Sequence, residues 1–388
     1  MAAAASRRLA ALRRQLAAPA AAAVPELPSW YAQAETVDET VARVEMDAAS
    51  WRAHRLSPQA REQFDRDGYL IIHDVLPQAD FERCCAALDE LRELRRSQGL
   101  PADKSVLDPV FSSSHTLWRE EAVVRMLKAP KVLPKVTDIM GWNVYLYHGH
   151  LTVDPPFRDG PSVPAESEQS PFGFHRDSGR VNQELEVPSG TPVPRLSVKA
   201  AFYLSDLSEP GRGQTWVIPG THKLGHDSPN PPARSGDDGG SRQPQGAIPL
   251  LVPPNSCAIF DRRLLHASSP NWSEHERKVI FYGYGYRWMR SKDVMDVGGA
   301  LQGDTAACPV TKQLLGWTIT NNGIFSPKAE DVPLREWMER HGMLDEDVGI
   351  DTVNHGGPLG SYIDSGYPWQ SHGDRPHSFN AVKRNGME

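Results

Sequence analysis

The chain has 388 residues, of which 39% are hydrophobic, so it is long and apolar enough to build a large folded core. Its formal net charge of −7 argues against nucleic acid or an acidic membrane surface as a partner. The sequence contains no run of about 18 apolar residues, and we therefore expect no membrane span.

Residues 1–25 differ in kind from the rest of the chain. They contain four arginines and no acidic residue. Arginines interrupt the apolar stretch that a secretory signal needs, whereas a basic segment rich in Ala and Leu is typical of an organellar transit peptide. The stretch 8–16, "RLAALRRQL", also resembles the N-terminal type of peroxisomal signal. We expect residues 1–25 to be read by the import receptor of a peroxisome or mitochondrion. The alternative is a disordered tail on a cytoplasmic protein.

Two predicted helices frame a short strand between residues 57 and 99. The segment 57–68, "SPQAREQFDRDG", opens with a Ser–Pro start signal and ends at a glycine, and the β run "YLIIHDVL" follows it. The segment 77–99 then carries apolar residues at helical spacing, from Phe81 to Leu94, and stops at another glycine. Residues 142–153, "WNVYLYHGHLTV", are aromatic and β-branched and predict a longer strand.

Short apolar and aromatic runs, separated by Gly and Pro turns, follow between residues 196 and 288, a pattern typical of a β-sandwich or barrel. Residues 227–246 have almost nothing to bury, and we expect a mobile surface loop there. From about residue 291 the chain is polar, with helical stretches such as "VPLREWMERHG". We therefore predict an α+β fold with one core domain, 26–290, and a C-terminal extension, 291–388, that packs on it.

The segment 172–180, "FGFHRDSGR", places His175 and Asp177 two residues apart. In a strand such residues point to the same face, so an imidazole and a carboxylate would aim at one point. His-x-Asp alone occurs by chance in many proteins. A second histidine, His266, ends a later predicted strand. Two His and one carboxylate on one face of an octahedron form an Fe(II) site with three open positions.

Arg277 begins the strand that follows His266. If Arg277 faces inward after the antiparallel return, alternation puts Val279 and Phe281 on the same face and Lys278 on the opposite one. A buried arginine is costly without an anionic partner. A dicarboxylic cosubstrate would supply that partner.

Several segments taken together resemble one family. They are "FDRDGYLIIHDVL" (64–76), "YHGHLTVDPP" (147–156), "HRD" (175–177), "GRGQTWVIPGTHK" (211–223) and "LLHASSPNWS" (264–273), in the family's order. Over roughly residues 60–290 the sequence is similar to the phytanoyl-CoA dioxygenase family of Fe(II)- and 2-oxoglutarate-dependent oxygenases. The resemblance implies a double-stranded β-helix, a jelly-roll or cupin-like barrel flanked by helices, with the metal at its mouth. Residues 26–290 would then be the catalytic domain.

The resemblance also implies roles for individual residues. His175, Asp177 and His266 correspond to the iron ligands of the family. Arg277 corresponds to the arginine that pairs with the distal carboxylate of 2-oxoglutarate, and Ser268 to a hydroxyl residue that helps to bind it.

Lys199 shares one face of the strand "LSVKAAFYLSDL" with Ala201, near which some family members carry an aromatic residue. If that face points inward, Lys199 would touch cosubstrate or substrate; the alternative is a lysine at the barrel rim. His148 and His150 also share a face of a strand, but no third ligand accompanies them. We interpret this pair as structural, with pocket-lining residues as the alternative.

The chemistry that the resemblance implies is hydroxylation of an unactivated C–H bond in a small organic substrate. 2-Oxoglutarate and O₂ are consumed, succinate and CO₂ are released, and ascorbate would serve as a reductant. A peroxisomal address would favour a branched acyl-CoA as substrate. Two alternatives stay open: a halogenase-like relative, which Asp177 argues against, and a jelly-roll ligand-binding protein without catalysis.

Overall fold

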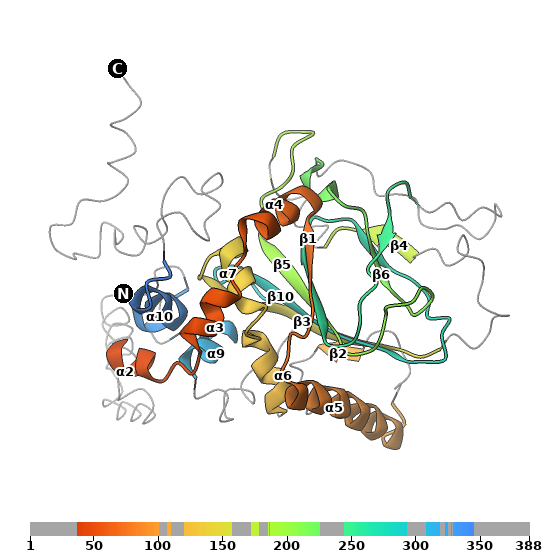
Figure 1. Ribbon diagram of the computed structural model, residues 1–388, viewed down its shortest axis with the longest axis horizontal. Coiled ribbons are helices and arrows are strands. Elements are labelled where there is room, and N and C mark those ends of the chain that lie inside the picture. Colours follow the sequence, from red (N-terminus) through yellow and green to blue (C-terminus); the bar gives the residue numbers. More distant parts are fainter. Residues whose placement is uncertain are drawn as a thin grey trace, which may run out of the picture. The chain divides into compact units, whose positions relative to one another are not determined.

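The computed structural model describes residues 37–100, 107–109, 120–156, 172–177, 185, 187–225, 244–292, 308–318, 323–324, 327 and 329–344. The expected targeting segment, most of the expected surface loop and the end of the C-terminal extension lie outside these residues. Two antiparallel sheets form the centre of the described part, as Figure 1 shows.

The larger sheet has six antiparallel strands whose order in space differs from their order in the chain. From one edge to the other the strands are β1 (Tyr69–Ile72), β8 (Ser256–Asp261), β5 (Ser197–Tyr203), β10 (Arg277–Tyr286), β3 (Val144–Asp154) and β2 (Leu107–Pro109). Strands far apart in sequence therefore become neighbours, as winding a chain between two sheets requires.

The smaller sheet consists of β4 (Phe172–His175), β9 (His266–Ser268), β6 (Thr215–Val217) and β7 (Ile248–Pro249), in that order. It faces the larger sheet across an inner cluster of buried apolar side chains. This inner cluster includes Ala201, Tyr203, Phe260 and Phe281 from the larger sheet and Val217 from the smaller one. The predicted α+β fold, a double-stranded β-helix flanked by helices, is confirmed.

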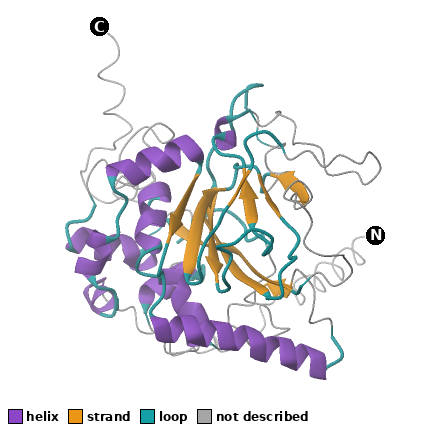
Figure 2. Ribbon diagram, turned by 45° about the vertical axis from the view of Figure 1, so that its right-hand side comes forward, coloured by secondary structure: helices purple, strands orange, loops and turns teal. Residues whose placement is uncertain are grey.

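Helices cover the outer face of the larger sheet, and Figure 2 shows most of them on one side of the strands. They are α2 (Val37–Ala42), α3 (Ala48–Ala53), α4 (Pro58–Asp67), α5 (Gln78–Ser97), α6 (Glu121–Arg125), α7 (Leu133–Met140), α9 (Pro309–Leu314) and α10 (Pro333–Arg340). The largest buried apolar cluster joins this layer to the sheet. None of the described helices is long and apolar enough to cross a membrane.

Two tyrosines of β10 fix the helical layer to the sheet. The hydroxyl of Tyr282 donates to the carbonyl of Val123 at 2.8 Å, and that of Tyr284 donates to the carbonyl of Leu127 at 2.9 Å. Buried tyrosines usually satisfy their hydroxyls in this way, which gives an otherwise apolar contact a defined geometry.

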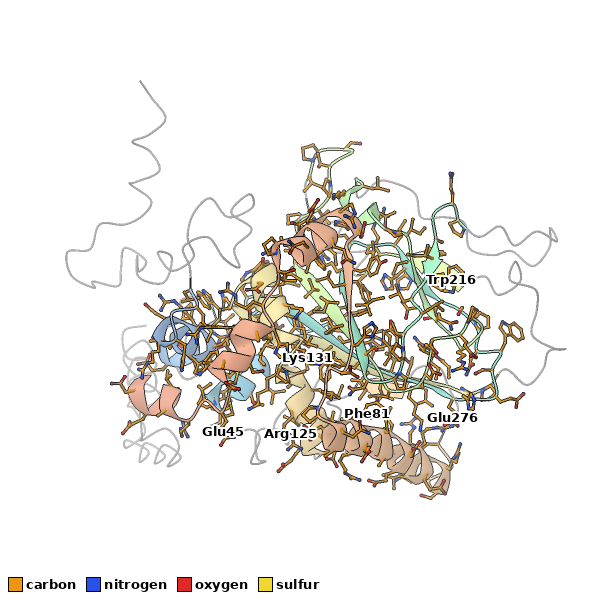
Figure 3. All side chains as sticks on the ribbon, in the orientation of Figure 1. Glu45, Phe81, Arg125, Lys131, Trp216 and Glu276 are labelled. Carbon is orange, nitrogen blue, oxygen red and sulfur yellow. The ribbon has the colours of Figure 1, made fainter. Side chains whose placement is uncertain are left out.

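An ion pair joins two of the helices to each other. Arg125 of α6, labelled in Figure 3, lies 2.7 Å from Asp80 of α5.

The helix boundaries follow from the signals in the sequence. Ser57 caps α4 by accepting a hydrogen bond from the backbone N–H of Ala60, and Gly68 ends the helix in the left-handed conformation. In α5, Cys84, Leu88 and Leu91 are buried. Leu94 is 39% exposed, so the apolar face of this helix ends earlier than its sequence pattern predicts.

The close approach of Gly68 and His222 joins two distant segments of the chain. A Cβ atom at Gly68 would lie 2.4 Å from Nδ1 of His222, which is itself 2% exposed. The other ring nitrogen of His222 lies 3.2 Å from the carbonyl oxygen of Asp65. His222 therefore packs the start of the fold against the turn after β6.

We expect Gly68→Ala to destabilise the protein more than Gly99→Ala. Both glycines have positive φ, 84° and 68°, but a Cβ at Gly99 would meet nothing within 4 Å. The left-handed backbone alone should cost Gly99→Ala about 1 kcal/mol. Gly68→Ala adds a steric overlap, for which a further cost of about 1–3 kcal/mol is typical. Urea unfolding of both variants measures the difference, and equal losses would contradict this account of the contact.

Candidate metal centre

Strand pairing brings the two predicted histidine ligands together. β4 and β9 are antiparallel, and His175 lies directly opposite His266 in their register. The two ring centroids are 4.4 Å apart. Residues directly opposite each other on neighbouring strands are the closest cross-strand pairs, so this register alone places two imidazoles at one point.

Asp177 reaches the same point by a different route from the one predicted. β4 ends at His175, so Asp177 lies beyond the strand, and its backbone N–H donates to the carbonyl of Arg262 at 2.9 Å. Strand alternation is therefore not what aims the carboxylate. The ligand atoms of His175, Asp177 and His266 nevertheless lie within 4.8 Å of one another.

The histidine ring orientations suit metal binding. Nδ1 of His175 lies 3.1 Å from the carbonyl of Gly173, and Nδ1 of His266 lies 2.9 Å from the carbonyl of Leu264. A carbonyl can only accept, so each Nδ1 carries a proton and Nε2 is the nitrogen left for a metal. Burial lowers the pKa of His266 to about 4, so this imidazole is neutral near pH 7. Two imidazoles and one carboxylate fit Fe(II).

Lys199 faces inward and contacts Asp177. Its ammonium lies 2.6 Å from Oδ2 of Asp177, and both side chains are buried. Burial opposes the ionisation of Asp177, but Lys199 and then His266 outweigh it and hold the pKa of this carboxyl well below its usual range. The Lys199 ammonium also lies 5.7 Å from the ring centroid of Phe260 and 5.6 Å from that of Phe281. Lys199 is thus a central residue and not one at the rim.

Arg277 is 1% exposed and shares the inward face of β10 with Val279 and Phe281, which belong to the inner cluster. Its partner, however, belongs to the same chain: Nη1 lies 2.6 Å from Oδ2 of Asp154 and 3.3 Å from the hydroxyl of Thr152. The expectation that a cosubstrate alone would neutralise Arg277 is therefore incomplete. Asp154, near the end of the segment "YHGHLTVDPP", lies directly opposite Arg277 in the register of β3 and β10.

A threonine that the sequence analysis missed contacts the other end of the guanidinium. Nη2 of Arg277 lies 3.4 Å from the hydroxyl of Thr215 on β6. The predicted Ser268 lies opposite Thr215 on the neighbouring β9 and is exposed. Ser268 is thus one strand away from the hydroxyl that reaches Arg277.

A glycine makes room for Arg277. Gly213 has a φ of +75°, and a Cβ atom there would lie 2.8 Å from Cδ of Arg277. Both the backbone conformation and the contact exclude a side chain at this position. The second glycine of "GRGQTW" therefore positions the arginine.

His148 and His150 face the interior from β3. Nδ1 of His150 lies 2.7 Å from Nε2 of His148, and the His150 ring stacks on Phe281 with 4.5 Å between centroids. Burial, together with the nearby charge of Lys199, lowers the pKa of His150 to about 2, so its ring is neutral. The geometry favours the alternative interpretation, in which this pair lines the interior beside Lys199.

Substitution of any of the three candidate ligands should disrupt metal binding without unfolding the protein. Loss of a residue that merely supports a ligand costs about 10–100-fold in metal affinity, so His175→Ala, Asp177→Ala and His266→Ala should each cost more. Calorimetric titration with Ni(II) measures the affinity, and thermal melting monitors the fold. His275→Ala, which changes an exposed histidine, is the control. Near wild-type affinity in one of the three variants would exclude that residue as a ligand.

Several known proteins are similar to this chain. Ectoine dioxygenase of Stutzerimonas stutzeri (strain A1501) is 21% identical over 284 residues, which cover 67% of this chain and 84% of the relative. The ectoine dioxygenase of Sphingopyxis alaskensis is 24% identical over 180 residues, 43% of this chain and 50% of the relative. Among solved structures, HygX from Streptomyces hygroscopicus with nickel and 2-oxoglutarate bound has 18% identity and a TM-score of 0.42, covering 61% of this chain and 90% of HygX.

The chain also matches a known protein family over a range that contains the candidate site. Residues 64–279, over half of the chain, match the family described as phytanoyl-CoA dioxygenase (PhyH). This range contains both candidate histidine ligands, Asp177 and Arg277. The chain therefore belongs to the phytanoyl-CoA dioxygenase family of Fe(II)- and 2-oxoglutarate-dependent dioxygenases.

Proposed function

We propose that the protein hydroxylates an unactivated C–H bond of a small organic substrate, with 2-oxoglutarate and O₂ as cosubstrates and succinate and CO₂ as co-products. The convergence of the ligand atoms of His175, Asp177 and His266 to within 4.8 Å of one another is the observation that carries this proposal. These residues would hold Fe(II) and leave three positions for cosubstrates. When bound, the metal supplies the redox chemistry that couples decarboxylation of 2-oxoglutarate to oxidation of the substrate.

Arg277 would orient the cosubstrate by its distal carboxylate. Its Nε atom is buried and has no hydrogen-bond partner among the residues that the structure describes, so the guanidinium keeps donor capacity beyond its pairing with Asp154. Asp154 would hold the planar fork in place, and the hydroxyls of Thr215 and Ser268 would complete the carboxylate site. A planar fork suits a carboxylate better than an ammonium does, which explains an arginine here.

The residues around the centre would exclude water. Ala201, Tyr203 and Phe281 belong to the inner cluster and are buried. The rings of His148 and His150 would offer the substrate hydrogen bonds. A dry, mostly apolar surrounding strengthens the electrostatic contacts that hold the cosubstrate and limits side reactions.

Two observations suggest different substrates. The resemblance of residues 8–16 to a peroxisomal signal favours a branched acyl-CoA. The curated relatives named ectoine dioxygenase favour a small cyclic amino acid derivative such as ectoine. A screen that couples 2-oxoglutarate turnover to mass spectrometry identifies the substrate by a product that is 16 mass units heavier, with and without ascorbate.

Residues 1–25 would direct the protein to a peroxisome or mitochondrion through an import receptor, and the catalytic domain would engage no nucleic acid. The four arginines and the absence of acidic residues support this assignment. A fluorescent fusion of the full chain tests it against a fusion lacking residues 1–25. A diffuse cytosolic signal from both would contradict it.

Succinate formation should depend on Fe(II) and on the three candidate ligands. We expect the wild-type protein with Fe(II) and 2-oxoglutarate to form succinate slowly, and faster once the substrate is present. Chelation of the metal or His266→Ala should abolish the reaction. A protein that binds substrate but forms no succinate with Fe(II) would instead support the ligand-binding alternative. A chlorinated product in the presence of chloride would support the halogenase-like one.

Arg277→Ala should raise the KM for 2-oxoglutarate by roughly two orders of magnitude. Removing one partner of a buried charge pair costs about 3–5 kcal/mol, and about 1.4 kcal/mol is tenfold in affinity. Asp154, left without its partner, would also repel the incoming carboxylate. The matched control is Lys278→Ala, because Lys278 lies on the outer face of the same strand and pairs with Asp89 of α5. A normal KM in Arg277→Ala would reassign the cosubstrate anchor.

A further inference from the structure

Lys199 forms an ion pair with the carboxylate oxygen of Asp177 that a metal would also bind. Oδ2 of Asp177 lies 2.6 Å from the ammonium of Lys199 and 3.9 Å from Nε2 of His266. A divalent ion shared by Asp177 and His266 would approach this same oxygen. Lys199 and a divalent metal would therefore compete for the same oxygen of Asp177.

Lys199 depends on this partner. Asp177 is the carboxylate with which it forms an ion pair among the residues that the structure describes. Its described neighbours include the rings of Phe260 and Phe281, and its charge helps to lower the pKa of His150. A buried ammonium that loses its carboxylate partner is costly, so Lys199 needs a new anion whenever a metal binds Asp177.

The formal charges of the buried centre show where that anion comes from. Without metal, Lys199 balances Asp177 and Arg277 balances Asp154, so these four charges sum to zero. A divalent metal alone leaves an excess of two positive charges. 2-Oxoglutarate carries two negative charges and restores neutrality, one carboxylate at Arg277 and the other at the metal beside Lys199.

We propose that Lys199 couples metal binding to cosubstrate binding: it competes with the metal for Asp177 and is released to the metal-proximal carboxylate of 2-oxoglutarate. This inference rests on the proposed function. Lys199 acts here as a positioning residue, whose charge makes the metal bind weakly alone and tightly together with 2-oxoglutarate. By thermodynamic linkage, the metal tightens 2-oxoglutarate binding by the same factor.

The test is calorimetric titration of the full chain with Ni(II), without and with saturating 2-oxoglutarate. Lys199→Met removes the charge but keeps an unbranched apolar stem between the two phenylalanine rings. We expect this variant to bind Ni(II) alone at least about tenfold more tightly than the wild type does, and 2-oxoglutarate to enhance its Ni(II) binding at least about tenfold less. Lys199→Arg, which keeps the charge, should retain most of the coupling.

Lys278→Met is the matched control, because it removes a lysine that pairs with an aspartate on the outer face of the same sheet. It should leave both Ni(II) affinities unchanged. Ni(II) binding in Lys199→Met that is no tighter than in the wild type, or an unchanged enhancement by 2-oxoglutarate, would overturn the proposal. Absence of Ni(II) binding in all proteins, the wild type included, would instead contradict the metal site itself. Thermal melting establishes that each variant is folded.

Discussion

The antiparallel pairing of β4 with β9 is the constraint around which the site is arranged. These strands are four and three residues long, yet their register sets His175 directly opposite His266. β4 lies at the edge of the smaller sheet, so β9 is its only strand partner among the described residues. The hydrogen bond from Asp177 to the carbonyl of Arg262 then ties the end of β4 to the chain beyond β8. A short edge strand can thus carry a site because it is held at both ends.

The larger sheet divides structural and chemical tasks between its two faces. On β10, Tyr282 and Tyr284 point outward to the helices, whereas Arg277 and Phe281 point inward to the site. Because side chains alternate, one strand serves both tasks without compromise. The outer face is held by a large apolar cluster, which allows the inner face to keep charged residues that add little to stability.

Patterns local to the sequence predicted much of this arrangement. The capping residues of α4 predicted its limits, and the alternation of β10 predicted that Lys278 faces away from Arg277. Alternation also predicted that Lys199 shares a face with Ala201, but whether that face points inward was left open. The pairing of Arg277 with Asp154 could not be predicted in this way, because it depends on the register of β10 against β3, which includes an irregularity at Gly283. The convergence of Asp177 with the two histidines was predicted, but the reason given for it, strand alternation, was wrong. Asp177 lies beyond the strand and is held by a backbone contact to Arg262, which is distant in sequence.

The close contact between Gly213 and Arg277 has a consequence for how this enzyme can be altered. The backbone of residue 213 packs directly against the Arg277 side chain. The residue type at 213 and the conformation of the arginine therefore cannot change independently. Randomised libraries should therefore recover glycine at 213 whenever selection requires an intact arginine. A functional side chain there should arise only together with a shorter residue at 277. Engineering of cosubstrate preference would start from this pair of positions and not from the metal ligands.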